Sequence, residues 1–164
     1  MTTPGQRSMF DANSILLRVP PPLWFIVTFA AGFELDRIVP WVPAWMAGMV
    51  PRAAGLLLMI VSGVLALLAF LCFRRRRTTV LPWKQPAALI RSGPFAFSRN
   101  PLYLSLTLLT MGGALLGGLP WVLLLVPLPV AMLDRVVIPF EEMQLRRTLG
   151  GDYDAYCLKV RRWL

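Results

Sequence analysis

Long apolar stretches dominate this chain, and they limit its fold more than any other feature. Four of them, at 20–39, 53–73, 102–118 and 119–138, approach the roughly 20 residues that a helix needs to cross a hydrocarbon layer of about 30 Å. Of the 164 residues, 57% are hydrophobic and 15% are charged, which excludes an ordinary soluble domain. The sequence therefore predicts an all-α, polytopic integral membrane protein: one domain, 1–164, with about four transmembrane helices.

Turn residues and prolines mark the last two stretches. A Gly-Gly-Leu-Pro sequence at 117–120 is all that separates them, so we expect a tight helical hairpin. Pro127 and Pro129 lie inside the final stretch and lack backbone donors, which predicts a kink or a break. Such an interruption would either open a cavity or remain a local irregularity of the helix.

The residues after Pro139 have an amphipathic pattern. Apolar and aromatic side chains recur at helical spacing, interrupted by a Gly-Gly pair at 150–151; they are Leu145, Leu149, Tyr153, Tyr156, Val160 and Trp163. We expect a C-terminal amphipathic helical segment along the membrane, in which the aromatic residues serve mainly in packing. Arg161 and Arg162 are expected to face lipid headgroups or solvent.

Cationic residues suggest an orientation. The segment 74–99 contains seven Lys and Arg residues and no acid, which is typical of a cytoplasmic loop. With four spans, both termini would share that side. The net charge of +9 flanks apolar stretches and accompanies no nucleic-acid module, so anionic lipid headgroups are the expected partner rather than nucleic acid.

Residue types also exclude some chemistry. The chain has no histidine, so Ser–His and Cys–His nucleophilic machinery is excluded, and we expect no metal site. Cys72 and Cys157 have no disulfide or metal-site spacing and are expected to be plain thiols. Near the end of the first stretch, Glu34, Asp36 and Arg37 either mark an intramembrane site or form an ion pair at the interface.

A polar constellation surrounds the last two apolar stretches. Arg99 and Asn100 precede them, directly before Pro101, and Glu141 and Glu142 follow them. Arginine offers a fork of donors suited to a carboxylate, and glutamates accept hydrogen bonds from hydroxyl or ammonium groups. These residues either bind a zwitterionic ligand or form a juxtamembrane ion-pair cluster.

The same region resembles a known family. The run RSGPFAFSRNPLY at 91–103, followed by Gly112, the Glu141-Glu142 pair, Leu149-Gly150 and Arg162-Trp163, is similar to the isoprenylcysteine carboxyl methyltransferase and phospholipid methyltransferase superfamily. The likeness covers 80–164 closely. Isoprenylcysteine enzymes usually carry His at the position of Asn100, and Asn there is more typical of the bacterial relatives.

The resemblance implies a small helical enzyme that binds S-adenosylmethionine on the cytoplasmic side. It implies methylation of a lipophilic substrate that arrives from the bilayer, and a cofactor-binding part at about 89–164. The residues implied to hold the cofactor are Phe95, Arg99, Asn100, Tyr103, Gly112, Glu141 and Glu142, with Asn100 and Glu142 as the candidate catalytic residues.

The methyl acceptor remains open among a carboxylate, an amine and a thiol, on a lipid-like or lipid-linked molecule. A protonated amine or a thiol would need a base, for which this chain offers Glu141, Glu142, a tyrosine or water. The alternative is a non-enzymatic small membrane scaffold or permeation protein. Glycine pairs at 112–113 and 117–118 permit close helix contacts, within the monomer or across a homodimer.

Overall fold

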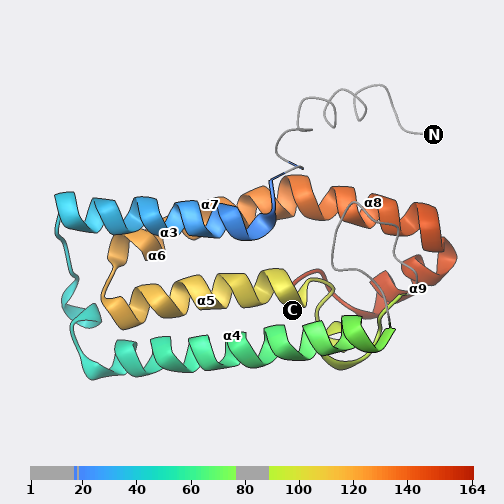
Figure 1. Cartoon of the computed structure of the whole chain (residues 1–164), viewed down its shortest axis with the longest axis horizontal. Helices are drawn as coiled ribbons and strands as arrows, with labels where there is room; N and C mark the ends of the chain where they lie inside the picture. Colours follow the sequence, from blue (N-terminus) through green and yellow to red (C-terminus); the bar gives the residue numbers. More distant parts are fainter. Residues whose placement is uncertain (1–16, 18, 77–88) are drawn as a thin grey trace.

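The protein is a set of helices laid lengthwise beside one another (Figure 1). A computed structural model describes residues 17, 19–76 and 89–164, so Arg77 and Lys84 of the cationic segment lie outside the described part. All regular elements in that part are helical, in chain order: α3 (Pro21–Ile38), η1 (Ala44–Met46), α4 (Met49–Arg76), η2 (Gly93–Ala96), α5 (Pro101–Gly117), α6 (Pro120–Leu125), α7 (Pro127–Met132), η3 (Leu133–Val137), α8 (Ile138–Leu149) and α9 (Gly151–Lys159). The predicted all-α class is confirmed for these residues.

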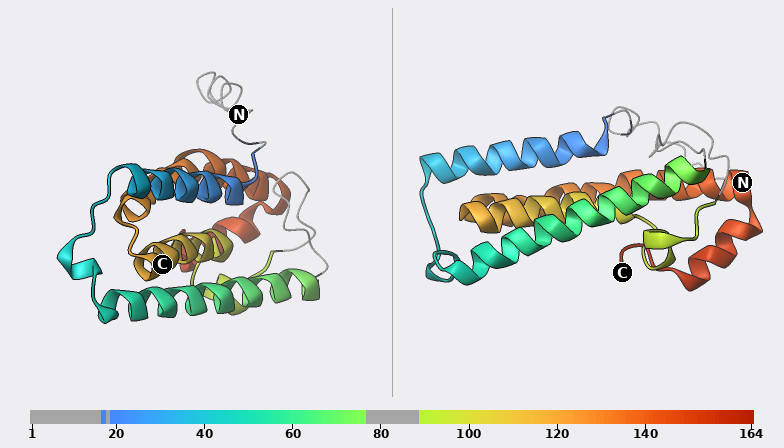
Figure 2. Two further views of the ribbon diagram at one scale, coloured as in Figure 1. Left: turned by 60° about the vertical axis from the view of Figure 1, so that its left-hand side comes forward. Right: turned by 60° about the horizontal axis from the view of Figure 1, so that its bottom comes forward.

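Two helical stretches of the described chain, not four, are long and apolar enough to cross a membrane. They are Met49–Arg75, which is most of α4, and Pro120–Leu149, which joins α6 to α8. The predicted first span, α3, ends with three charged residues, and the predicted third, α5, has 17 residues, or about 25 Å of helix. The prediction of four spans is therefore wrong by this measure. Instead, α5 packs along α4, and α3 packs against α6 (Figure 2).

Glycines let α4 and α5 approach each other closely. A Cβ atom added to Gly112 would lie 2.7 Å from the carbonyl oxygen of Gly55, and one added to Gly55 would lie 2.6 Å from that of Gly112. Further along the same contact, the Ser62 hydroxyl donates to the Ser105 carbonyl at 2.7 Å. The two helices therefore touch backbone to backbone, as small residues permit within a membrane.

The hairpin between α5 and α6 is confirmed. Gly118 adopts a left-handed conformation (φ 66°) directly after α5, and Pro120 begins α6. From there, α6, α7, η3 and α8 follow one another without a loop. The apolar span predicted at 119–138 therefore continues without a loop into the amphipathic segment predicted after Pro139, and the helical stretch ends at Leu149, directly before the predicted break at 150–151.

The predicted interruption near Pro127 is confirmed. Here α6 ends at Leu125 and α7 begins at Pro127, and the Val126 N–H bonds three residues back, to Leu123, at 3.4 Å. A π-helical turn, η3, follows at once. Such a turn accommodates an additional residue and changes which side chains share a helix face.

After α8, the chain turns at Gly150 (φ 55°) and α9 folds back toward the bundle (Figure 1). Tyr153, Tyr156 and Val160 form a buried cluster, so the predicted packing role of these aromatic residues is confirmed. However, α9 ends at Lys159 and Val160 is extended (φ −124°, ψ 128°). The expectation that one helical repeat continues to Trp163 is therefore wrong.

Candidate active site

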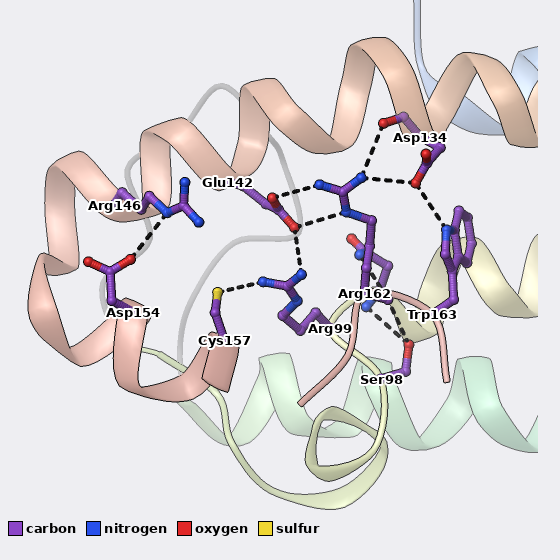
Figure 3. Close-up of polar contacts among 10 residues, drawn as sticks. Ser98, Arg99, Asp134, Glu142, Arg146, Asp154, Cys157, Arg162 and Trp163 are labelled. Atoms are coloured by element: carbon purple, nitrogen blue, oxygen red, sulfur yellow. Dashed lines mark hydrogen bonds and ion pairs between the residues drawn. The ribbon is translucent and has the colours of Figure 1, made fainter. Parts of the chain in front are cut away.

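The candidate site lies at the end of the bundle where separate parts of the chain meet. These parts are the turn before α5, the middle of α8, α9 and the segment 160–164 (Figure 3). Gly93, at φ 61°, and Pro94 begin the η2 turn, and Pro101 opens α5, where a missing N–H costs nothing. The non-helical stretch between η2 and α5 holds Arg99 and Asn100 at the mouth of α5.

Arg99 is at the centre of this cluster. Its Nη2 lies 3.2 Å from Glu142 Oε1, its Nη1 contacts Cys157 Sγ, and its backbone N–H donates to the Arg161 carbonyl at 3.0 Å. Only 14% of the Arg99 side chain is exposed. The Nε–H is buried and has no partner among the described residues. The guanidinium therefore has a donor left for a ligand.

Glu142 is held by two arginines. Arg162 donates to both of its oxygens, Nε to Oε1 at 3.2 Å and Nη2 to Oε2 at 3.0 Å, in the bidentate geometry that makes such pairs strong. The third guanidinium nitrogen, Nη1, lies 3.0 Å from Asp134 Oδ1. The hydrogen bond to Glu142, followed by that to Asp134, raises the pKa of Arg162. Two cations and two carboxylates are thus balanced in one connected network.

Asn100 uses its donors within the protein. Its side-chain Nδ2 donates to the Arg162 carbonyl at 3.0 Å, and its backbone N–H donates to Ser98 Oγ at 3.2 Å. The Ser98 side chain is fully buried. Asn100 is therefore oriented by the segment 160–164.

Tyr103 and Glu141 form a separate pair. The Tyr103 hydroxyl donates to Glu141 Oε1 at 2.5 Å. Because consecutive residues on a helix point about 100° apart, Glu141 and Glu142 serve different partners. Glu141 faces Tyr103 on α5, whereas Glu142 faces the arginines.

Two of the predicted cofactor residues, Phe95 and Gly112, lie in packing contacts. Phe95 is buried beside Phe73, with ring centroids 5.4 Å apart, and its carbonyl accepts the Tyr156 hydroxyl at 2.7 Å. Gly112 is in the α4–α5 contact described above. The structure therefore brings together Arg99, Asn100 and Glu142, keeps Tyr103 with Glu141 close by, and leaves Phe95 and Gly112 to support the fold.

Sequence reasoning missed the role of Arg162, which it assigned to headgroups or solvent. On a regular helix, residues eight apart, such as Asp134 and Glu142, lie about 80° apart around the axis. The π-helical turn η3 adds a residue between them and brings both within reach of one guanidinium. The only signal in the sequence was the Arg162-Trp163 motif itself, and the helical pattern could not show which way its side chains point.

No group of three or more metal-ligating side chains occurs in the described part of the chain. The interactions of the cluster are ion pairs and hydrogen bonds. Their arrangement suits binding of an organic ligand with charged ends, through Arg99 for an anion and through the two glutamates for hydroxyl or ammonium groups.

Comparison with protein families gives one match. The family model described as phospholipid methyltransferase matches residues 50–152, which include nearly all of α4, then α5, the stretch α6 to α8 and the start of α9. Comparison with curated proteins and with solved structures gives no significant match. The family match covers more than half of the chain and includes Arg99, Asn100 and both glutamates.

The match also agrees with the two long apolar helices. The chain is therefore an integral membrane protein that belongs to the phospholipid methyltransferase family, within the superfamily that also contains the isoprenylcysteine carboxyl methyltransferases.

Proposed function

We propose that this protein uses S-adenosylmethionine to methylate a lipid-like or lipid-linked acceptor at the cytoplasmic face of the membrane. Family membership supports methyl transfer, and the long apolar helices support an acceptor drawn from the bilayer. The observation that carries the proposal is the state of Arg99. Its guanidinium is largely buried at the end of the bundle and retains one unpartnered donor.

The residues present fit the methyl donor. S-adenosylmethionine carries a carboxylate, an ammonium group and ribose hydroxyls. Arg99, with its free Nε–H, suits the carboxylate. Glu142 and Glu141 suit the ammonium group or the hydroxyls, and Tyr103 holds Glu141 in place. We assign donor binding to Arg99, Tyr103, Glu141 and Glu142, and donor binding with a catalytic role to Asn100 and Glu142.

The donor, when bound, supplies a methyl group on a positively charged sulfur. The protein must then align an acceptor and keep water away, which the surrounding apolar helices favour. An acceptor carboxylate is ready at neutral pH. An amine or thiol acceptor would instead pass its proton to a carboxylate of the site or to water.

The charges of the described residues support a cytoplasmic site. Exposed cations gather near the end of α4, on α8 and α9, and just beyond; they are Arg74, Arg75, Arg146, Arg147, Lys159 and Arg161. Such residues favour the cytoplasmic side and attract anionic headgroups. We infer a multi-pass protein with both termini on that side. In support, α3 begins and α8 ends toward this end of the bundle (Figure 1).

The test uses purified protein in nanodiscs made from a bacterial lipid extract, supplied with S-adenosylmethionine labelled in its methyl group. We expect label in the lipid fraction, and its loss in Glu142→Gln. Asp154→Asn is the matched control, because it removes a carboxylate that also pairs with an arginine, but on an exposed surface. Base treatment then identifies the acceptor: a methyl ester releases methanol, whereas N-methyl and S-methyl groups survive.

The contradicting result is also clear. If folded wild-type protein transfers no label in any lipid extract and does not bind S-adenosylhomocysteine, the methyltransferase proposal fails. The protein would then be a membrane scaffold or permeation protein, in which the same charges only fix the topology.

A further inference from the structure

The segment 160–164 lies between α8 and the turn that carries Arg99 (Figure 3). It leaves α9 in an extended conformation and forms no helix. Its carbonyl groups accept hydrogen bonds from the turn: Arg161 from the Arg99 N–H at 3.0 Å, and Arg162 from Asn100 Nδ2 at 3.0 Å. Two candidate site residues are therefore oriented by this one short segment.

Two carboxylates of the long helix, Asp134 and Glu142, hold the segment, and Asp134 contacts two consecutive residues of it. Asp134 Oδ1 accepts from Arg162 Nη1 at 3.0 Å and from Trp163 Nε1 at 3.1 Å, which are side chains of consecutive residues. The other two nitrogens of Arg162 bind Glu142, so all three guanidinium nitrogens are engaged. The plane of that guanidinium is fixed, and the Glu142 carboxylate is fixed with it.

Exposure decreases along this chain of contacts. The exposed fraction of the side chain is 41% for Asp134, 31% for Arg162 and 10% for Glu142. Asp134 thus acts from the rim of the site on a buried carboxylate. Within the segment, only the Val160 N–H makes a helical hydrogen bond, to the Tyr156 carbonyl at 3.0 Å, so side-chain contacts of this kind add to the few backbone contacts that keep it in place.

We propose that Asp134 is a positioning residue for the methyl-donor site. It fixes Arg162 and Trp163. Through them it sets the direction of the Glu142 carboxylate and the place of the carbonyls that orient Arg99 and Asn100. The family match ends at residue 152, so Asp134 and Glu142 lie within it, whereas their partners Arg162 and Trp163 lie beyond it. This inference rests on the proposed function, because it gives Asp134 a role only if Arg99 and Glu142 bind the donor.

The first measurement is S-adenosylhomocysteine affinity by calorimetry in nanodiscs. We expect Asp134→Asn to weaken binding about tenfold, since the acceptor shared by Arg162 and Trp163 loses its charge, and Asp134→Glu to restore part of it. The control Asp154→Asn removes the 3.2 Å pair with Arg146 and should leave the affinity unchanged.

A double-mutant cycle tests whether Asp134 acts through Arg162. We expect Arg162→Gln to weaken binding at least as much as Asp134→Asn does, and Asp134→Asn to add less than twofold in the Arg162→Gln background. Full additivity of the two effects, or an unchanged affinity in Asp134→Asn, would overturn the inference. A loss that merely reflected lower stability would also appear in the thermal midpoint, which we expect to change little.

Hydrogen exchange separates this inference from the proposed function, because it needs no ligand. Asp134→Asn should increase exchange at the Arg99 amide, whose acceptor is the Arg161 carbonyl, and leave α4 unchanged. If exchange increases but wild-type protein binds no S-adenosylhomocysteine, the contact network is correct and the proposed function is wrong. If wild-type protein binds and neither exchange nor affinity changes in the variant, the positioning role is wrong.

Discussion

The two ends of the bundle use the same kinds of charged side chain in different ways. At the far end, Arg37 and Glu34 pair at 3.2 Å within one helix, with 67% and 57% of their side chains exposed. At the site end, Arg99, Arg162 and Glu142 come from different elements and share partners in a largely buried network. Pairs of the first kind contribute little to stability, whereas removing one member of a buried network leaves charges without partners.

The comparison shows which charges fix the structure of a site. The Glu34–Arg37 pair favours the ion-pair alternative considered for these residues over an intramembrane site. The site-end network joins residues that are far apart in sequence, so its geometry depends on the whole fold. The effects of substitutions at the two ends should therefore differ in size and in kind.

The largest effect is expected from Glu142→Gln. The change leaves two arginines around a neutral amide, and we expect it to lower the free energy of unfolding by about 3 kcal/mol and to abolish S-adenosylhomocysteine binding. Denaturant unfolding of the detergent-solubilised protein and calorimetry measure the two effects. A variant as stable as wild type, with unchanged affinity, would remove the distinction between the two ends.

Gly112→Ala should affect stability but not the site. The new methyl group would lie 2.7 Å from the Gly55 carbonyl oxygen, so α4 and α5 must separate, at a cost of about 1–3 kcal/mol. Gly63→Ala on the open face of α4 is the control, since no atom lies within 4 Å of its added Cβ. Reduced donor affinity without reduced stability would support the role that the family resemblance implies for Gly112.

Tyr103→Phe tests whether the role of Glu141 depends on its hydrogen bond with the Tyr103 hydroxyl. Loss of the 2.5 Å hydrogen bond leaves Glu141 without that donor, and we expect donor affinity to fall by about three- to tenfold, less than in Glu142→Gln. Calorimetry under the same conditions measures the difference. An effect as large as that of Glu142→Gln would mean that both glutamates belong to one unit.

The smallest effect is expected from Glu34→Gln. An exposed pair within one helix contributes about 0.5 kcal/mol or less, so the thermal midpoint should move little and donor affinity should not change. A large loss of activity in this variant would instead place a functional site at the far end of the bundle.

Much of the fold followed from the sequence because helices in this chain are long, apolar and bounded by proline or glycine. Pro101 and Pro120 begin helices where expected, and Gly118 ends one. The break expected at Gly150-Gly151 is also found, since α8 ends at Leu149 and Gly150 is its C-cap.

The site was predicted less completely. A pairing between Arg99 and the glutamates belonged to the ion-pair alternative, and the structure contains it as the 3.2 Å contact with Glu142. The inward turn of Arg162 could not be predicted, because it depends on where α9 ends and on the π-helical turn that presents Asp134. Neither feature has a local sequence signature of its own.

The central claim is that Arg99 binds the methyl donor, and calorimetric titration of S-adenosylhomocysteine into the protein in nanodiscs tests it most directly. Wild type should bind saturably, and Arg99→Lys should bind on the order of tenfold or more weakly, because lysine retains the charge but lacks the guanidinium fork. Arg146→Lys, which changes an exposed arginine on α8, should bind like wild type. Equal affinity in wild type and Arg99→Lys, with both proteins folded, would contradict the account.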